Sequence, residues 1–359
     1  MIWEELNYSL LEVKKAGRVL RGDSISGVTE GDALKILDNW RAVHSYPLQV
    51  FYVRLRTVSK KLDSSSLTAQ RLKRASSIIA KLRRRYYGRN PSMELTQMQD
   101  IAGCRTILST ATLAKRLAEE EYIKKKGDLK HKLVGTKDYI TNPKPDGYRS
   151  IHLIYSYKSD KKNKKRYDGL LVEIQIRSKL QHIWATAVET VDFFTRQAIK
   201  SNEGQPEWID FFRLISSAFA KLENCPPVPN TPSIDEGLYS QILQKERELN
   251  VINKVRGWAS AMKIFDEQLR KKGANLFLLE LDIRGGKLTI HSYTRREEKK
   301  ALEEYAALEK RYSSNKEYDV VLAGVDAEHD LKKAYPNYFV DTNEFLGQLD
   351  KIIKIANRH

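Results

Sequence analysis

The stretch KDYITNPKPDGYRSIHLIY, residues 137–155, contains a loop that leads directly into a strand. Its first half carries two prolines and a glycine, which favour an irregular backbone. From Ser150 onward, apolar and polar residues alternate, as is typical of a strand with one buried face. Tyr148, Arg149 and His152 stand where the loop meets the strand. Because loops held by a rigid element often carry function, we expect a binding site at this junction.

Strand and helix patterns surround this junction on both sides. Strands are predicted at residues 101–108, 150–157 and 170–177, and helices at residues 112–125 and 181–196. The first 60 or so residues have helical spacing with an interruption at Pro47, and residues 66–87 favour one helix dense in Arg and Lys. This mixture predicts the α+β fold class.

A second domain is expected because 359 residues are more than one core usually serves. The proline-rich run at residues 226–232 predicts a linker. Beyond it we expect an apolar helix stripe at residues 251–269 and a β-hairpin around Gly285-Gly286 at residues 275–293. A charged helix at 295–311, a strand at 318–324 and a final helix at 343–355 should follow. We therefore predict a domain at 1–233, connecting helices at 234–272 and a small α+β module at 273–359.

Composition narrows the classes of function. The 63 Lys and Arg against 46 Asp and Glu give a net charge of +17, which favours a polyanionic partner such as RNA, DNA, a nucleotide or an anionic membrane. A surface charged for solubility is the alternative. Cys104 and Cys225 are too few for a disulfide framework or a Cys-based metal site. Without a signal-like start or a long apolar run, we expect a cytoplasmic protein with no membrane partner.

Candidate chemistry begins with two carboxylates. In the strand at residues 170–177, Glu173, Gln175 and Arg177 share the polar face, and for this strand alone a solvent-exposed sheet surface is the simpler explanation. Asp100, however, heads the strand at 101–108. Two carboxylates near strand ends, together with cations, are the components of a metal-assisted phosphoryl-transfer site, and Mg²⁺ is the metal that suits them.

The expected helix at residues 66–87 supplies the cations. Arg71, Arg74, Lys81 and Arg85 recur at near-helical steps, so they can share one face and bind phosphate. A solvated basic face is the alternative. No Walker A motif is present, which argues against P-loop chemistry.

Four motifs occur in one order and spacing: RLKRASSIIAKL, DIAGCR, KDYITNPKPDGYRSIHLIY and VEIQIRSKLQHIWA. Over roughly residues 60–195 the chain thereby resembles the RelA/SpoT-type synthetase domain. The resemblance implies a mixed-sheet, nucleotidyltransferase-like pyrophosphokinase domain flanked by helices. It also implies transfer of the β,γ-pyrophosphate of ATP to a ribose 3′-hydroxyl, with release of AMP.

The same resemblance assigns roles to individual residues. Asp100 and Glu173 would bind Mg²⁺, and Glu173 would act as general base. The residues that would bind ATP are Arg71, Lys73, Ser77, Lys81 and Arg105. The residues that would bind the acceptor are Tyr148, which would stack on its base, Arg149, His152, Gln175 and Arg177.

Two departures point to a particular branch of the family. Thr190 occupies a position where the family usually has His, and the tail KKAYPNYFVDT places Tyr335 and Tyr338 three residues apart. Behind a pyrophosphokinase domain, this tail resembles CapRel, a fused toxin–antitoxin branch of the toxic small alarmone synthetases. That resemblance implies pyrophosphorylation of the tRNA 3′-CCA end, and a pseudo-zinc-finger antitoxin whose Tyr-x-x-Tyr blocks the ATP site. It also implies that a phage capsid protein releases this block of the ATP site. We expect the protein to be a monomer.

Two other functions stay open at this point. One is a small alarmone synthetase that makes (p)ppGpp from ATP and GDP or GTP. The other is a non-catalytic RNA-binding or capsid-binding protein. The basic runs YIKKKGDLKHK and SDKKNKKRYDG suit a tRNA backbone and a solvated loop equally well.

Overall fold

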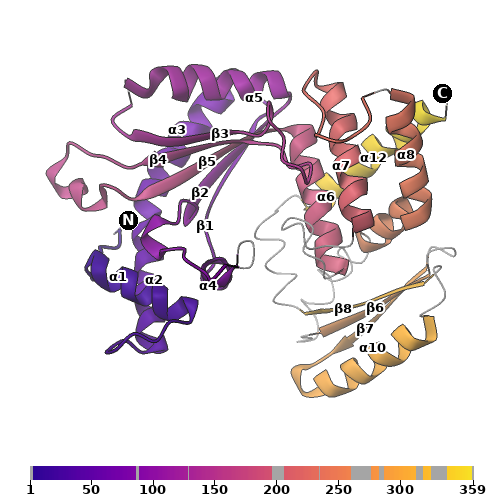
Figure 1. Ribbon diagram of the computed structural model, residues 1–359, viewed down its shortest axis with the longest axis horizontal. Coiled ribbons are helices and arrows are strands. Elements are labelled where there is room, and N and C mark those ends of the chain that lie inside the picture. The colour runs from indigo at the N-terminus through magenta and orange to yellow at the C-terminus, as the bar shows by residue number, and fades with distance from the viewer. Residues whose placement is uncertain are drawn as a thin grey trace. The chain divides into compact units, whose positions relative to one another are not determined.

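The computed structural model describes residues 3–85, 89–127, 129–195, 206–233, 235–259, 276–282, 287–312, 318–324 and 338–357. Contacts divide the chain into two compact units. The first comprises Met1–Ile140 with Ser150–Lys179, and the second comprises Thr141–Arg149 with Leu180–His359. Figure 1 shows the helices and strands of both units. The divisions at residues 233 and 273 expected from the sequence stay predictions.

Three helices open the first unit and confirm the helical expectation for this region: α1 (Leu10–Arg21), α2 (Glu30–Val43) and α3 (Ser45–Leu62). A capping box between Ser9 and Glu12 starts α1, and Gly22 ends it in a left-handed conformation with φ 114°. Pro47 lies in the first turn of α3, where the missing N–H costs nothing, so it does not break that helix.

The mixed sheet predicted for the first unit is confirmed. Its strands are β1 (Leu67–Leu72), β2 (Ala102–Leu108), β3 (Lys132–Asp138), β4 (Ile151–Ser156) and β5 (Leu171–Ser178), in the order β1-β2-β5-β4-β3. Only the β2–β5 pair is parallel. Helices α3 and α5 (Ala111–Ala118) pack on the sheet. Phe51 of α3 meets Tyr155 of β4 at 5.4 Å between ring centroids, so α3 lies against the buried face.

The expected single helix at residues 66–87 is wrong. The chain forms β1 and then a short helix, α4 (Ala75–Arg83), so Arg71 lies on a strand and Arg85 lies beyond the helix. Antiparallel pairing of β1 with β2, which places Arg71 opposite Gly103, overrides the local helical pattern. The short remaining elements of this unit are η1 (Leu95–Gln97), η2 (Glu119–Ile123), η3 (Lys124–Gly127) and η4 (Lys162–Tyr167).

The second unit contains a helical layer built from α6 (Lys179–Thr195), α7 (Pro206–Leu222), α8 (Asp235–Leu249) and α12 (Tyr338–Ala356). Aromatic side chains fill its core, among them Trp184, Phe212, Trp258 and Phe345. The proline run forms an irregular connection between α7 and α8, both of which belong to this unit, and its role as a linker between domains stays a prediction. Val251, Val255 and Trp258 are buried, in agreement with the expected apolar stripe, whose positions from 262 onward lie outside the described residues.

A small antiparallel sheet completes the second unit. Its order is β7 (Lys287–Tyr293), β6 (Leu276–Asp282) and β8 (Tyr318–Gly324), with η6 (Arg295–Glu297) and α10 (Glu298–Tyr312) packed beside it. These strands confirm the predicted β runs, although the Gly285-Gly286 turn lies outside the described residues. Tyr335 also lies outside them, and Tyr338 is the first residue of α12. The pseudo-zinc-finger identity of the module stays a prediction.

We expect Gly147→Ala to lower the melting temperature more than Gly169→Ala does. Both glycines have left-handed φ angles, 92° and 89°, so each alanine adds a strain of about 1–2 kcal/mol. A Cβ at Gly147 would also lie 3.0 Å from Trp184 Cζ2 and 3.1 Å from Ser216 Cβ, whereas a Cβ at Gly169 would have no atom of the described residues within 4 Å. Equal shifts for both variants in thermal denaturation would contradict the close packing around Gly147.

Candidate active site

One face of the first sheet carries the predicted catalytic strand residues side by side. Residues paired across neighbouring strands point to the same side of a sheet. Glu173 of β5 pairs with Gly103 of β2, and Gln175 of β5 pairs with both Arg105 of β2 and His152 of β4. On the opposite face of β5, Val172, Ile174 and Ile176 are fully buried. The alternation seen in the sequence therefore separates a core face from a half-buried polar face.

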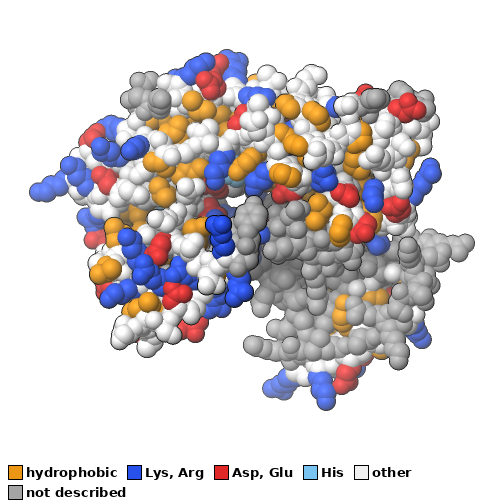
Figure 2. All heavy atoms as spheres, viewed as in Figure 1, with side chains coloured by type: hydrophobic (Ala, Val, Ile, Leu, Met, Phe, Trp, Pro, Cys, Tyr) orange, Lys and Arg blue, Asp and Glu red, His pale blue; other side chains and the backbone are white. Residues whose placement is uncertain are grey.

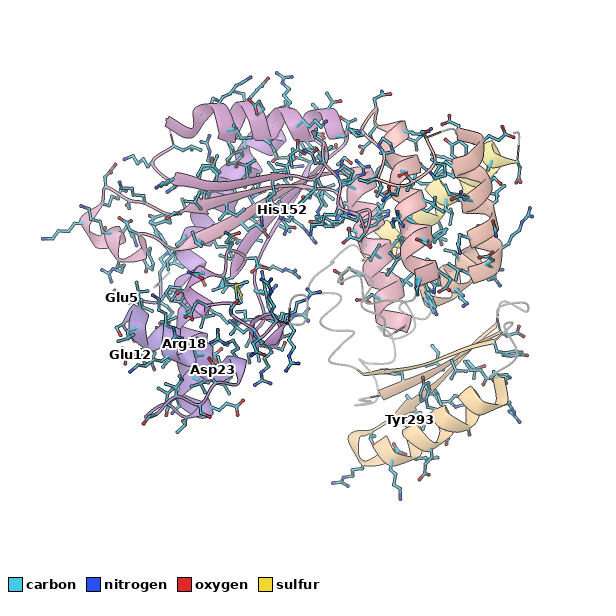
Figure 3. All side chains as sticks on the ribbon, viewed as in Figure 1. Glu5, Glu12, Arg18, Asp23, His152 and Tyr293 are labelled. Carbon is cyan, nitrogen blue, oxygen red and sulfur yellow. The ribbon has the colours of Figure 1, made fainter. Side chains whose placement is uncertain are left out.

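The carboxylate of Glu173 is held by two neighbours on this polar face. His152 Nδ1 lies 2.9 Å from Glu173 Oε1, and Gln175 Nε2 donates a hydrogen bond of 2.7 Å to Glu173 Oε2. His152, labelled in Figure 3, comes from β4. Burial raises the pKa of Glu173, but the hydrogen bond and charge of His152, the Gln175 donor and the charge of Lys81 together lower it to about 2. Glu173 is therefore ionised at neutral pH.

The second carboxylate, Asp100, lies in the turn before β2 and contacts two lysines. Lys73 Nζ is 3.1 Å from Asp100 Oδ2, and Lys81 Nζ is 2.9 Å from Asp100 Oδ1. The backbone N–H of Lys73 donates to Ile101 O at 2.7 Å, which fixes the end of β1 against the start of β2. Because the charge of Lys81 also acts on Glu173, one ammonium group lies within the electrostatic field of both carboxylates.

Such an arrangement suits the binding of phosphate and a hard cation. Mg²⁺ commonly takes one or two protein carboxylates and completes its coordination with water and phosphate oxygens. Asp100 and Glu173 supply those carboxylates, and the ammonium group shared between them shows that this position favours positive charge. Among the described residues, no group of three or more His, Cys, Asp or Glu side chains could hold a metal by itself.

The other residues expected to bind ATP lie on the same unit. Arg71 is exposed on β1, opposite Gly103, and Ser77 is half-buried in the first turn of α4. Arg105 is half-buried on the polar face of β2. Their contacts with ATP stay predictions. The sequence did not single out Gly103, where, among the described residues, the nearest atom to an added Cβ within 4 Å would be Glu173 O, at 3.9 Å.

Tyr148 and Arg149 belong to the second unit. The half-buried ring of Tyr148 packs against the core of that unit, and Lys144 Nζ lies 5.0 Å from its centroid. Arg149 is 4% exposed, and its guanidinium donates to Ser216 Oγ at 3.0 Å and to Pro226 O at 2.6 Å. Burial lowers the pKa of Arg149 to about 10. These contacts indicate that Arg149 anchors its loop, and the acceptor roles of both residues stay predictions.

Thr190, the residue that departs from the family pattern, is buried within α6. Its hydroxyl donates to Thr186 O at 2.8 Å, one turn earlier in the same helix. The observed contact is therefore internal to the helix.

Comparison with known proteins places the chain in a family. Residues 70–193 match the family described as "Region found in RelA / SpoT proteins". The chain is 30% identical to GTP pyrophosphokinase YwaC of Bacillus subtilis over 169 residues, which are 44% of this chain and 78% of the relative. It is 31% identical to GTP pyrophosphokinase YjbM of the same species over 149 residues, 41% of this chain and 66% of the relative.

Solved structures also match, among them small alarmone synthetase 1 from Bacillus subtilis bound to its product pppGpp. That likeness has 24% sequence identity and a TM-score of 0.43, and it covers 53% of this chain and 94% of the other. On the sequence relationships, the chain belongs to the RelA/SpoT family.

Proposed function

We propose that the protein is an ATP-dependent pyrophosphokinase that acts on a ribose 3′-hydroxyl. The observation that carries this proposal is that the site contains two carboxylates. Glu173 is held by His152 and Gln175, and Asp100 is held by Lys73 and Lys81. In the reaction the acceptor 3′-oxygen attacks the β-phosphorus of ATP, the bond from that phosphorus to the α–β bridging oxygen breaks, and AMP leaves. Glu173 orients the hydroxyl and takes its proton.

The charged residues of the site fit the donor. Lys73 and Lys81, with Arg71 and Arg105, place cations where the negative charge of a triphosphate must be neutralised during in-line transfer. Mg²⁺ would be held by Asp100 and Glu173, and it would supply further neutralisation of the phosphate oxygens. We propose Mg²⁺ as the metal because both protein ligands are carboxylates.

For the acceptor, a guanosine nucleotide is the first candidate. Two relatives of this chain are named GTP pyrophosphokinases, and the family match over residues 70–193 includes Asp100 and Glu173. On this proposal the chain makes (p)ppGpp from ATP and GDP or GTP.

The tRNA 3′-CCA end is a second candidate, and a basic corner of the first unit favours it. The two lysine-rich runs lie together, because Lys130 pairs with Asp160, and the N–H of Lys158 donates to His131 Nδ1 at 3.2 Å. The exposed cations of this corner are Lys130, Lys132, Lys158, Lys161, Lys162, Lys165 and Arg166. Figure 2 shows Lys and Arg side chains gathered at this end of the unit.

The basic corner is a fixed surface, which suits a phosphate backbone better than a loose loop would. Beneath it, the rings of Tyr46 and Tyr167 lie 4.7 Å apart, and those of His131 and Tyr157 stack at 4.9 Å. Tyr167 is buried and donates its hydroxyl proton to Glu4 O at 3.0 Å. Lys and Arg side chains that lie above these rings would displace the counterions of a nucleic acid when it binds.

Competition between acceptors tests the two candidates. The chain is incubated with β,γ-labelled ATP, Mg²⁺ and equimolar GDP, GTP and tRNA, and the labelled products are separated. Label on GDP or GTP supports the guanosine acceptor, and label on the tRNA 3′ end supports tRNA. The charge-reversed variant Lys161→Glu/Lys162→Glu/Lys165→Glu should lose transfer to tRNA but keep any transfer to GDP and GTP. If neither the folded wild-type chain nor a folded Tyr338→Ala chain, in which the restraint proposed below is lost, labels any of the three, the non-catalytic alternative replaces this proposal.

We also propose that the C-terminal module restrains the enzyme. This proposal follows the resemblance of the Tyr335 and Tyr338 segment to a toxin–antitoxin fusion that serves in phage defence. A tether raises the effective concentration of an inhibitory segment to about the mM range for a short linker. A phage capsid protein that binds the module would release the restraint, and a trigger that switches nearly all molecules needs about 5.5 kcal/mol of differential binding. We propose that the active form is a monomer.

Tyr338→Ala is expected to make expression of the chain inhibit growth without any trigger, because the restraint is lost. Adding Glu173→Gln should restore growth, since inhibition depends on the reaction. Growth curves after induction, with immunoblots for soluble protein, measure both effects. Normal growth of cells that contain soluble Tyr338→Ala protein would contradict the proposed restraint.

A further inference from the structure

The polar side chains of β5 are linked by hydrogen bonds whose donors and acceptors follow one direction along the strand. Arg177 Nη2 donates to Gln175 Oε1 at 3.0 Å, and Gln175 Nε2 donates to Glu173 Oε2 at 2.7 Å. All three side chains project from the same face of the strand at alternate positions. The hydrogen bonds therefore run from a cation, through an amide, to the carboxylate.

This direction follows from the chemistry of the three groups. A guanidinium only donates hydrogen bonds, so the end of the Gln175 amide that faces Arg177 must be its oxygen. The amide nitrogen then faces Glu173, which as a carboxylate only accepts. Arg177 and Glu173 therefore select the same orientation of the Gln175 amide, and Arg177 holds its oxygen end in place.

The second oxygen of Glu173 is fixed from the neighbouring strand. His152 on β4 is the cross-strand partner of Gln175, and its Nδ1 lies 2.9 Å from Glu173 Oε1. Donors from two strands therefore hold both carboxylate oxygens and set the direction in which the plane of the carboxylate faces. A shift of about 1 Å in such a group costs up to about 10²-fold in rate.

Arg177 is itself placed to act through Gln175. It is 5% exposed, and β5 continues from it directly into α6. Hydrogen bonds in a chain of this kind polarise one another in the low dielectric of the interior.

We propose that Arg177 and Gln175 form a positioning relay that orients the carboxylate of Glu173, and that neither residue acts by binding the acceptor. This inference rests on the proposed function, because it assigns the relay to the group that handles the 3′-hydroxyl. Positioning residues of this kind change kcat, whereas residues that bind the acceptor change its KM.

Gln175→Glu is the sharpest test, since it keeps the size of the side chain and can still accept from Arg177. It no longer donates to Glu173, so kcat should fall by about 10²-fold while the KM values for ATP and acceptor stay within about threefold. The matched control is Gln70→Glu, which changes an exposed amide of β1 that bonds Gln49. A raised acceptor KM with unchanged kcat would overturn the relay.

A double-mutant cycle adds an independent readout. If Arg177 acts through Gln175, the double variant Arg177→Met/Gln175→Leu should be no slower than Gln175→Leu alone. Losses that multiply would show that the two residues act separately and would overturn the proposal. Unfolding of the Arg177→Met protein does not affect the Gln175→Glu comparison, which leaves the buried arginine in place.

A measurement that needs no turnover separates this inference from the proposed function. In crystal structures of Gln175→Glu and Arg177→Met, the plane of the Glu173 carboxylate should be turned relative to the wild-type chain. If the wild-type chain transfers no pyrophosphate but this turn is found, the proposed function fails and the relay stands. An unchanged carboxylate orientation in both variants would overturn the relay whether or not the chain is active.

Discussion

Glu173→Gln is expected to lower kcat for pyrophosphate transfer by about 10²–10⁴-fold, the usual contribution of a general base. The substitution keeps the size of the side chain and removes the negative charge that attracts the acceptor hydroxyl proton and a metal ion. Lys73 and Lys81, the lysines proposed to bind ATP, contact Asp100, so ATP affinity should change much less than kcat. Single-turnover release of AMP, with equilibrium binding of a non-hydrolysable ATP analogue, measures the two quantities.

Glu120→Gln is the matched control, because that carboxylate is exposed and pairs with Arg116 one turn away on the surface. It should leave kcat unchanged. A Glu173→Gln enzyme whose kcat stays within about threefold of the wild type would show that this carboxylate takes no part in the chemistry.

The same substitution has a predicted effect on acid stability. The pKa of Glu173 is about 2 in the folded chain, below its ordinary value of 4.5. Its ionised form therefore stabilises the folded state above about pH 4.5, and this contribution is lost as the pH falls towards 2. The free energy of unfolding in urea should consequently fall less between pH 6 and pH 3 in Glu173→Gln than in the wild type.

The second large effect is expected at the C-terminal helix. His182 Nε2 of α6 lies 3.0 Å from Asp341 Oδ2 in the first turn of α12, and both side chains are buried. Asp341→Ala would leave the imidazole buried without that carboxylate, a loss of about 3 kcal/mol. For a unit of this size, the melting temperature should fall by roughly 6–12 °C.

Asp350→Ala makes the same change at a half-buried position of α12 and is the control. It should lower the melting temperature much less than Asp341→Ala does. Limited proteolysis adds a local readout, since cleavage within α12 should become faster in Asp341→Ala. Equal melting temperatures for the two variants would contradict the importance of the contact between α6 and α12.

Much of the first sheet was predictable because core and polar positions alternate throughout β2 and along most of β4 and β5, where Ile154 and Arg177 are buried on the polar face. The two edge strands were not. The sequence of β1 is compatible with a helix, and only its pairing with β2 makes it a strand. In β3, Lys-rich ends and a bulge between Leu133 and Gly135 obscure the alternation.

The candidate site was predictable as a set of residue types and less so as a set of contacts. The alternation in β5 places Glu173, Gln175 and Arg177 on one face, but nothing local shows that Arg177 bonds Gln175. Arg149 illustrates the reverse case. It stands beside the predicted acceptor aromatic in the sequence, yet its guanidinium is bonded to Ser216 and Pro226, more than sixty residues further along the chain. Such contacts depend on the tertiary fold.

The most direct test of the account is the chemistry of one turnover with Mg²⁺-ATP and the acceptor chosen by competition. Mass spectrometry with ³¹P NMR identifies the product, and chromatography counts the AMP. The account predicts a pyrophosphate on the acceptor 3′-oxygen, one AMP for each molecule of product, and loss of both in Glu173→Gln. Release of phosphate or ADP without 3′-pyrophosphorylated product, or full product formation by Glu173→Gln, would contradict it.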